Sequence, residues 1–312
     1  MPMARSVFFV LLFPGLLFTA VAGLAATWVD RKVTARLQWR VGPPLAQPLW
    51  DILKLLGKEV ILPRGGNHGL FLAAPLAGFA AVAVASAIVW IPMLQNTSFV
   101  GDVIVAVYLL VIPSLALMLG ALASGNPLAA VGASREMKLV LAYELPFLLS
   151  LVVAIVRSSF SISLAGIAAT PAVGSVSGAL AFVVSLLCIQ AKLGFVPFDV
   201  AEAETEIIAG AYVEYSGAPL AVFKLTQAML FVTLPVFLSA VFLGGLTFAG
   251  WGILWSILKI VGIIVLVIVI KNTNPRVRID QAVRFFWYGL APLAAAALAL
   301  ALVGRATGIG WL

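Results

Sequence analysis

Charged residues, cysteine and histidine are all scarce in this chain of 312 residues. Only 10% of the residues are charged, and there is one cysteine and one histidine. Cys188 has no partner for an internal disulfide, and one thiol is too few for an iron–sulfur cluster. His68 has no cysteine or carboxylate cluster around it, so we interpret it as a loop residue and not as a metal ligand. The sequence therefore predicts that this chain carries no metal ion or cofactor of its own.

Apolar residues are what the chain has in abundance. They make up 63% of the sequence, and the mean hydropathy is +1.16. About 20 apolar residues in a helix cross a bilayer core about 30 Å thick, and backbone groups in lipid must bond internally. The sequence therefore predicts an all-α, polytopic membrane protein, a single membrane domain over residues 1–312 with eight transmembrane helices. The eight apolar runs are about residues 7–29, 70–95, 101–124, 138–157, 178–198, 219–244, 253–271 and 285–304.

The net charge of +7 does not indicate nucleic-acid binding, because the basic residues sort by side. With eight spans, the connections 29–69, 125–137, 199–218 and 272–284 share one face, and most arginines and lysines lie there. Positive charge marks the cytoplasmic side of a membrane. We therefore expect a multi-pass protein of the cell membrane with both termini outside.

The first long connection contains the pattern of an amphipathic helix. Gly42-Pro43-Pro44 interrupts any helix, and Pro48 can open a new one in its first turn. Apolar side chains then recur at helical spacing, so the segment predicts a helix over about residues 48–61 that lies on the membrane surface. The alternative is a solvated linker. The polar side of the predicted helix is formed by Asp51, Lys54, Lys58 and Glu59.

Acidic residues gather in one stretch, FVPFDVAEAETEIIAGAYVEYSG, residues 195–217. Asp199, Glu202 and Glu206 are three and four residues apart, so they line one face if the segment is helical. Glu204 points away from that face, and Glu214 follows Gly210. Carboxyls this close titrate as a coupled set, which makes them candidates for a proton relay. The alternative is a solvated acidic loop, but the interleaved apolar residues favour a folded, half-buried segment.

One carboxylate lies inside a predicted span. Glu144 is six residues into the fourth apolar run, where an unpaired charge costs about 2.5–3.5 kcal/mol. We therefore expect it to face the bundle interior, a water-filled cavity or a basic partner; the alternative is a snorkelling position near the headgroups. Lys192, Lys224 and Lys259 are the candidate cations within the spans. Glu136 and Asp102 receive no role from the sequence.

Four blocks of the sequence resemble a known family. The blocks are residues 30–59 (DRKVTARLQWRVGPPLAQPLWDILKLLGKE), 120–144 (GALASGNPLAAVGASREMKLVLAYE), 197–217 (PFDVAEAETEIIAGAYVEYSG) and 272–293 (NTNPRVRIDQAVRFFWYGLAPL). They are similar, in this order, to the membrane subunit of respiratory complex I that borders the quinone chamber, the NADH dehydrogenase subunit 1 family. The same subunit recurs in membrane-bound nickel–iron hydrogenases and related ferredoxin-linked complexes. The resemblance covers about residues 28–300 and implies eight transmembrane helices.

The resemblance also implies roles for individual residues. Glu202, Glu204, Glu206 and Glu214 match carboxylates that lead from the redox module into the membrane, and Glu144 matches the glutamate thought to continue that proton path. The residues Asp51, Lys54, Lys58 and Glu59 fall on the family's surface helix. The basic positions that face the peripheral subunits or the acids are matched by Arg31, Arg36, Arg40, Arg276, Arg278 and Arg284.

Two departures favour one branch of the family. Quinone-reducing members usually have Glu-Thr-Asn-Arg before Pro-Phe-Asp, where this chain has Lys192-Leu193-Gly194-Phe195, and Ala201 replaces a usual proline. The resemblance therefore implies a non-catalytic coupling subunit of a hydrogenase-like or ferredoxin-linked complex. Its partners would be a hydrogenase-like large subunit and iron–sulfur subunits on the cytoplasmic face, with iron–sulfur clusters and nickel–iron held there, and antiporter-like membrane subunits. The alternatives are the quinone-chamber subunit of a quinone-reducing complex I and, in another class, a stand-alone secondary ion transporter.

Overall fold

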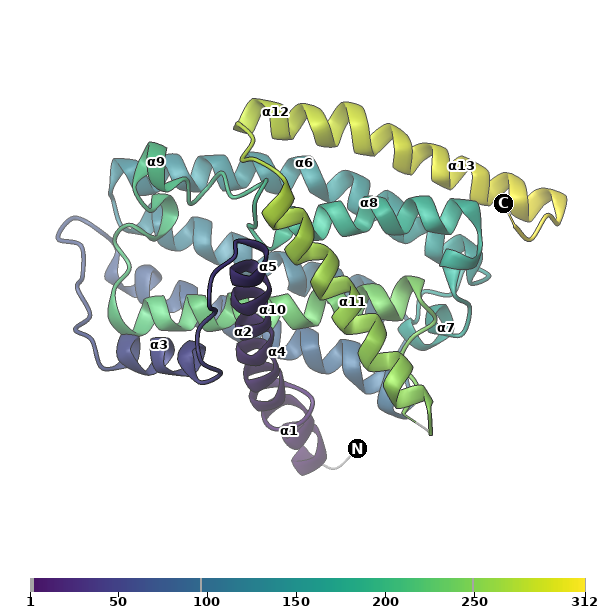
Figure 1. The fold of residues 1–312 in the computed structure, drawn as a ribbon, viewed down its shortest axis with the longest axis horizontal. Coiled ribbons are helices and arrows are strands. Elements are labelled where there is room, and N and C mark those ends of the chain that lie inside the picture. Colours follow the sequence, from purple (N-terminus) through teal and green to yellow (C-terminus); the bar gives the residue numbers. More distant parts are fainter. Residues whose placement is uncertain (1–2, 96, 249, 312) are drawn as a thin grey trace.

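The structure is a computed structural model that describes residues 3–95, 97–248 and 250–311, except for the side chains of residues 3–6, 204 and 205. Within these ranges all regular secondary structure is helical (Figure 1). The helices, with two 3-10 turns and one π-helical segment, are α1 Met3–Leu11, α2 Leu16–Leu37, α3 Gln47–Leu56, α4 His68–Gln95, α5 Asp102–Ala123, α6 Pro127–Arg157, α7 Leu164–Ala168, η1 Ala172–Gly174, α8 Val176–Lys192, α9 Glu204–Ile207, η2 Gly210–Tyr212, α10 Gly217–Phe242, α11 Gly252–Thr273, α12 Ile279–Arg284, η3 Phe285–Leu290 and α13 Ala291–Thr307.

The length and composition of these helices confirm an all-α polytopic membrane protein. In the part of the chain that the structure describes, seven helical spans are long and apolar enough to cross a membrane. An eighth is obtained if residues 164–174 and α8 are counted as one span, although the two parts meet at an angle of 107°.

The helix boundaries differ from those that the apolar runs predict. The first run is two helices, α1 and α2, and α2 continues to Leu37 through several charged residues. Helix α6 begins at Pro127, so the expected connection 125–137 is mostly helix. The reason is local: the side chain of Asn126 accepts a hydrogen bond from the Leu128 amide, and proline is favoured in the first turn. Residues 127–137 thus extend α6 beyond the predicted span.

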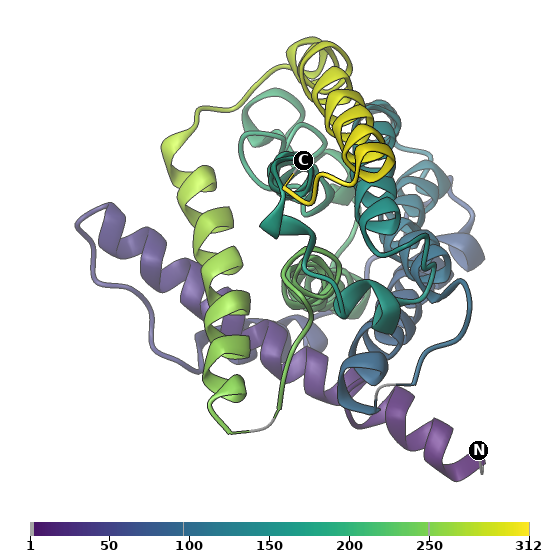
Figure 2. The ribbon, with the colours of Figure 1, turned by 90° about the vertical axis from the view of Figure 1, so that its right-hand side faces the viewer.

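Helix α10 is the centre of the bundle. Its apolar sequence is almost wholly buried along the helix, and Figure 2 shows it end-on with the other long helices around it. It packs against α2 and α4, and the close approach to α2 depends on Gly23. A side chain at position 23 would collide with the backbone of Ala228 in α10.

Helices α11 and α13 lie at the periphery. Most of their large side chains are exposed, including Trp251, Leu254 and Trp255 at the start of α11. In Figure 2, α11 stands apart from the right-hand group of helices, while α13 runs along one edge. These exposed faces are apolar, as expected for surfaces that meet lipid or other membrane subunits.

Helix α3 is amphipathic but shorter than predicted. It ends at Leu56, because Gly57 follows it and its amide bonds to the Leu53 carbonyl. Lys58 and Glu59, expected on this helix, therefore lie in the extended segment after it. Trp50, Leu53 and Leu56 are about half exposed on one side of α3, which forms an apolar surface beside the bundle.

The connections on either side of α3, the segment from residue 193 to 216 and helix α9 gather at one end of the bundle, on the left in Figure 1. We call this the α9 end. Helix α7 and the C-terminus lie at the opposite end.

Candidate functional site

The acidic segment does not form the single helix that would place its carboxylates on one face. Residues 198–203 are turns, and only Glu204–Ile207 form the short α9. The buried side chains Phe198, Val200 and Ala201 hold the first part of the segment against the bundle. Burial of these apolar side chains outweighs the local preference for a helix, so the predicted shared face of Asp199, Glu202 and Glu206 is wrong.

The carboxylates instead meet partners from different elements. Asp199 pairs with Arg276 at 2.7 Å, and Glu202 with Lys224 of α10 at 3.7 Å. Glu206 pairs with Arg135 of α6 at 2.5 Å. The sequence did not identify Arg135 as a partner, although it lies nine residues before Glu144 on the same helix.

Glu214 is held by Asn126, the residue that caps α6, whose amide nitrogen is 2.5 Å from the Glu214 carboxylate. Glu204 was also predicted in this cluster, but its side chain lies outside the described residues.

Two glycines let the acidic segment approach α6 closely. A side chain at Gly132 would meet the Ala211 amide nitrogen at 2.5 Å, and one at Gly210 would collide with the Ala201 carbonyl. Gly210 also has a positive φ of 51°, which disfavours other residues. The segment is therefore folded against the helix that carries Glu144.

Glu144 has the basic partner that its position requires. Lys192, at the end of α8, places its Nζ 3.1 Å from one Glu144 oxygen and 3.5 Å from the other. The Lys192 side chain is 1% exposed, and its Nζ lies 5.0 Å from the centre of the Phe147 ring. A buried ion pair with this geometry is costly to break by removing one partner.

Lys259 does not pair with an acid. Its Nζ donates to the carbonyls of Leu243 and Gly245, at 2.7 and 3.0 Å. These carbonyls follow the end of α10, where unsatisfied carbonyl groups attract a cation. The prediction that Lys259 serves one of the acids is wrong; it stabilises the connection between α10 and α11.

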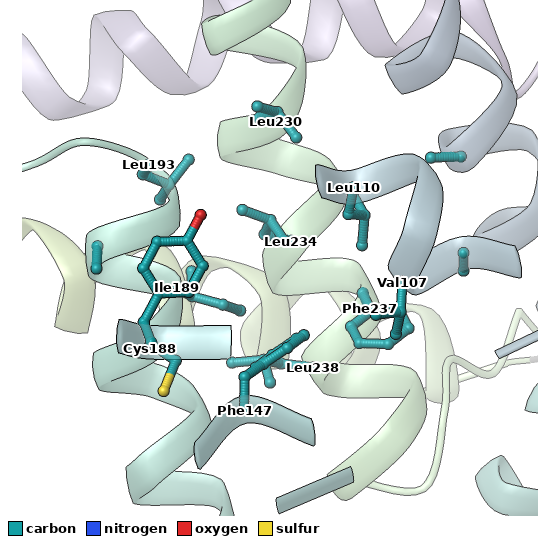
Figure 3. Close-up of a cluster of buried hydrophobic side chains, with 14 of the residues drawn as sticks. Val107, Leu110, Phe147, Cys188, Ile189, Leu193, Leu230, Leu234, Phe237 and Leu238 are labelled. Atoms are coloured by element: carbon teal, nitrogen blue, oxygen red, sulfur yellow. The ribbon is translucent and has the colours of Figure 1, made fainter. Parts of the chain in front are cut away.

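An internal cavity of about 50 Å³ lies where α5, α6, α8 and α10 meet the acidic segment. A water molecule needs roughly 10–15 Å³ of such space, so the cavity has room for a few waters. Leu193 and Leu230 form part of its wall, and Figure 3 shows them beside Leu110 and Leu234 in a dry apolar cluster. The charged residues on the cavity wall are Glu136, Lys192, Asp199 and Glu202.

Glu136 is the cavity residue to which the sequence gave no role. It lies in α6 and is 7% exposed. A signal for it was available, because Glu136 precedes Tyr143 by seven residues, two helical turns, and so shares a face with it. The other unassigned acid, Asp102, is buried and accepts a hydrogen bond from the Leu164 amide at 2.7 Å, which fixes the start of α7.

The remaining predicted basic residues lie outside the cavity. Arg31 pairs with Asp51 of α3 at 2.6 Å. The side chains of Arg36, Arg40, Arg278, Arg284, Lys54 and Lys58 are exposed, and so is Glu59. Arg36 and Arg40 come from the end of α2, and Arg278 and Arg284 from α12, so two segments far apart in the sequence both present exposed arginines.

The attachment of α3 to α2 is expected to weaken in acid. Partial burial opposes the shift, but hydrogen bonds from Arg31 and Gln47 and the Arg31 charge lower the pKa of Asp51. A lowered pKa stabilises the folded form above the unfolded value of about 3.9, and this contribution is lost as the pH falls through the folded value. Because both side chains are more than a third exposed, we expect a loss of about 0.2–1 kcal/mol. The mobility of a spin label on α3 should rise on acidification below about pH 4, and Asp51→Asn should remove that dependence.

No group of three or more histidine, cysteine, aspartate or glutamate side chains in the described ranges could hold a metal ion. Cys188 is buried beside Ile189 in the apolar cluster of Figure 3. The His68 ring bonds to the carbonyl of Pro63 in the connection before α4.

Comparisons with known proteins place the chain in a family. The family described as NADH dehydrogenase matches residues 9–302. The H-type membrane component of the NADH-quinone oxidoreductase of Thermomicrobium roseum is 35% identical, with 94% of this chain and 95% of the relative aligned. The same component from Anoxybacillus flavithermus is 34% identical over 85% of this chain and 84% of its own.

Among solved structures, the chain is similar to one from the membrane-bound sulfane sulfur reductase, an archaeal respiratory membrane complex. The TM-score is 0.84 at 27% sequence identity, and the match covers 95% of this chain and 99% of the other. The chain belongs to the NADH dehydrogenase subunit 1 family, the membrane subunits of complex I-related oxidoreductases.

Proposed function

We propose that this chain anchors and couples an ion-translocating oxidoreductase complex without itself catalysing the redox reaction. The peripheral redox module docks at the α9 end, and protons pass from there into the membrane through carboxylates. The observation that supports this most directly is the cavity whose wall carries both the acids of the 199–202 region and Lys192, the partner of Glu144. The relay residues on this proposal are Asp199, Glu202, Glu204, Glu206, Glu214 and Glu144.

The exposed arginines at the ends of α2 and α12 form the docking surface on this proposal. Arg36, Arg40, Arg278 and Arg284 offer fixed positive charge to an acidic partner surface, and such charges govern the rate and specificity of association. The partners are a hydrogenase-like large subunit and iron–sulfur subunits, and the cofactors belong to them. The arginines face the cytoplasm and both termini lie outside the cell membrane, in agreement with the positive-inside rule.

Antiporter-like membrane subunits receive the protons on this proposal. Glu144 also lies on the wall of an apolar groove of about 720 Å³ between α5 and α6, next to Tyr108 and Leu141, which are largely exposed. A carboxylate at the edge of so apolar a groove is costly in contact with lipid, so a polar neighbour on this face is favoured.

The hydrogenase-like or ferredoxin-linked branch is favoured over a quinone-reducing complex. Lys192 lies at the position where quinone-reducing members have a different motif, and it forms the buried pair with Glu144. The similarity to the sulfane sulfur reductase is in keeping with a complex outside the quinone-reducing group. The names of the two bacterial relatives favour the alternative, a quinone-reducing complex.

The test is to purify the protein from its native membrane in mild detergent and identify the accompanying subunits and metals. We expect a hydrogenase-like large subunit, iron–sulfur proteins and antiporter-like subunits to accompany it. The double variant Arg36→Glu/Arg278→Glu should lose the peripheral subunits and keep the membrane subunits. Arg157→Glu, on the opposite end of α6, is the matched control and should keep both.

Other outcomes would overturn the proposal or move it to another branch. Co-purification with a quinone-reducing set of subunits would replace the hydrogenase-like branch by the quinone-reducing one. A chain that purifies alone and transports an ion in liposomes would overturn the coupling role and support a stand-alone secondary transporter.

A further inference from the structure

Glu136 is a buried carboxyl that the proposed relay does not use. It lies between two groups that the relay does use: Glu202 interacts with it electrostatically from the acidic segment, and Lys192 shares the same cavity wall. The carboxyl has no basic partner within 4.0 Å among the described residues, in contrast to Asp199, Glu202 and Glu206. A buried acid without a cation needs a reason to be there, because apolar packing would be more stable.

The relay has a gap that Glu136 is positioned to fill. Glu202 is tied to Lys224 and lies within 3.5 Å of the Gln227 amide, on the α10 side of the cavity. Glu144 lies eight residues beyond Glu136 in α6, a rise of about 12 Å. Proton transfer needs heavy atoms about 2.6–3.2 Å apart, or one intervening water. A relay from the acidic segment to Glu144 therefore requires an intermediate group, and Glu136 is the carboxyl on the intervening cavity wall.

Tyr143 occupies the interval between Glu136 and Glu144. Its side chain is fully buried and interacts with both carboxylates, and the Ser114 hydroxyl of α5 lies beside it and beside Glu136. Within the described residues, the Tyr143 hydroxyl has no hydrogen-bond partner of good geometry. The Nζ of Lys192 is 5.4 Å from the centre of its ring. A phenolic hydroxyl both accepts and donates a hydrogen bond, so it can pass a proton on without holding a charge.

We propose that Glu136 is the carboxyl that carries the proton between Glu202 and Glu144. The O–H bond of protonated Glu202 breaks and an O–H bond on Glu136 forms, through water in the cavity. In the second step the Glu136 O–H bond breaks, the Tyr143 hydroxyl accepts that proton and donates its own, and an O–H bond forms on the Glu144 carboxylate. Lys192 then loses its ionic partner until Glu144 releases the proton. This inference rests on the proposed function and adds a residue to it.

The experiment uses the whole complex in sealed vesicles. Reduced methyl viologen supplies electrons, and a pH-sensitive dye inside the vesicles reports proton movement. Glu136→Gln should lower proton movement per electron roughly 100-fold, while electron transfer with an uncoupler present stays within about twofold of the wild type. Asp280→Asn, which removes an exposed carboxyl at the start of α12, is the matched control and should behave as the wild type.

Glu136→Asp separates a proton-carrying role from a packing role. It keeps the acid but withdraws it by one methylene, so proton movement should fall about tenfold and its solvent deuterium isotope effect should rise. A residue that only fills space would leave the isotope effect unchanged. The aspartate variant also serves if the glutamine variant does not assemble.

Two results distinguish this inference from the function on which it rests. If Glu136→Gln and Glu136→Asp move protons at the wild-type rate while Glu202→Gln and Glu144→Gln do not, Glu136 lies off the path and the inference is overturned. If Glu202→Gln and Glu144→Gln also move protons normally, the carboxylate relay itself is wrong.

Discussion

Replacing Lys192 with methionine is expected to destabilise the protein by about 3–5 kcal/mol, because it leaves the Glu144 carboxylate without its ionic partner. The Lys192 side chain is 1% exposed and donates to both Glu144 oxygens. Methionine fills a similar volume, so the loss is electrostatic and not a cavity. Thermal unfolding of the purified protein in detergent measures the effect.

The double variant Lys192→Met/Glu144→Gln provides the control. It removes both charges and should recover most of the lost stability, since replacing a whole buried pair is often nearly neutral. The coupling free energy from this double-mutant cycle isolates the ion pair from the packing of each side chain. Additive losses from the two single changes would contradict the expectation and would mean that Glu144 is already neutral or solvated.

Replacing Lys271 with methionine is expected to detach the end of α11 from the bundle, with a local loss of about 3–5 kcal/mol. Lys271 binds Asp30 of α2 at 2.7 Å, and Asp30 is 8% exposed. Helix α11 has few other polar contacts to α2; the Asn272 amide donates to the Thr34 hydroxyl at 3.0 Å. Without the lysine, Asp30 stays buried with no cation, and the cost falls on the junction of these two helices.

Limited proteolysis in the connection between α11 and α12 measures this change, because a detached α11 exposes residues 274–278. Thr273→Ala is the matched control, since Thr273 is exposed and its hydroxyl bonds only within α11. Equal cleavage rates in Lys271→Met and the wild type would contradict the expectation. They would mean that apolar contacts alone hold α11.

The sequence was most informative where the physics is local. Apolar runs identify the membrane spans, because lipid requires helices of a set length. The spacing around Trp50 and Leu53 likewise gives α3, which the structure places beside the bundle. Its predicted end was wrong because the capping by Gly57 was not considered.

Tertiary contacts decided what the sequence pattern could not. Asp199, Glu202 and Glu206 have helical spacing, yet each is drawn to a cation on another element. Lys192 and Lys224 were among the proposed cations and do lie against acids, whereas Lys259 is satisfied by backbone carbonyls. A sequence does not show which of several buried groups will neutralise a charge. Glu136 was left without a role for the same reason, because its surroundings come from α5, α8 and the acidic segment.

The size of the internal cavity sets what can pass through this part of the molecule. Its volume of about 50 Å³ is a third of the roughly 150 Å³ that holds a benzene ring in an engineered protein cavity. Water fits, and hydrogen-bonded water conducts protons without any molecule travelling the full distance. An aromatic ring does not fit, so in this arrangement the cavity is a filter that separates proton conduction from access by redox-active ring compounds.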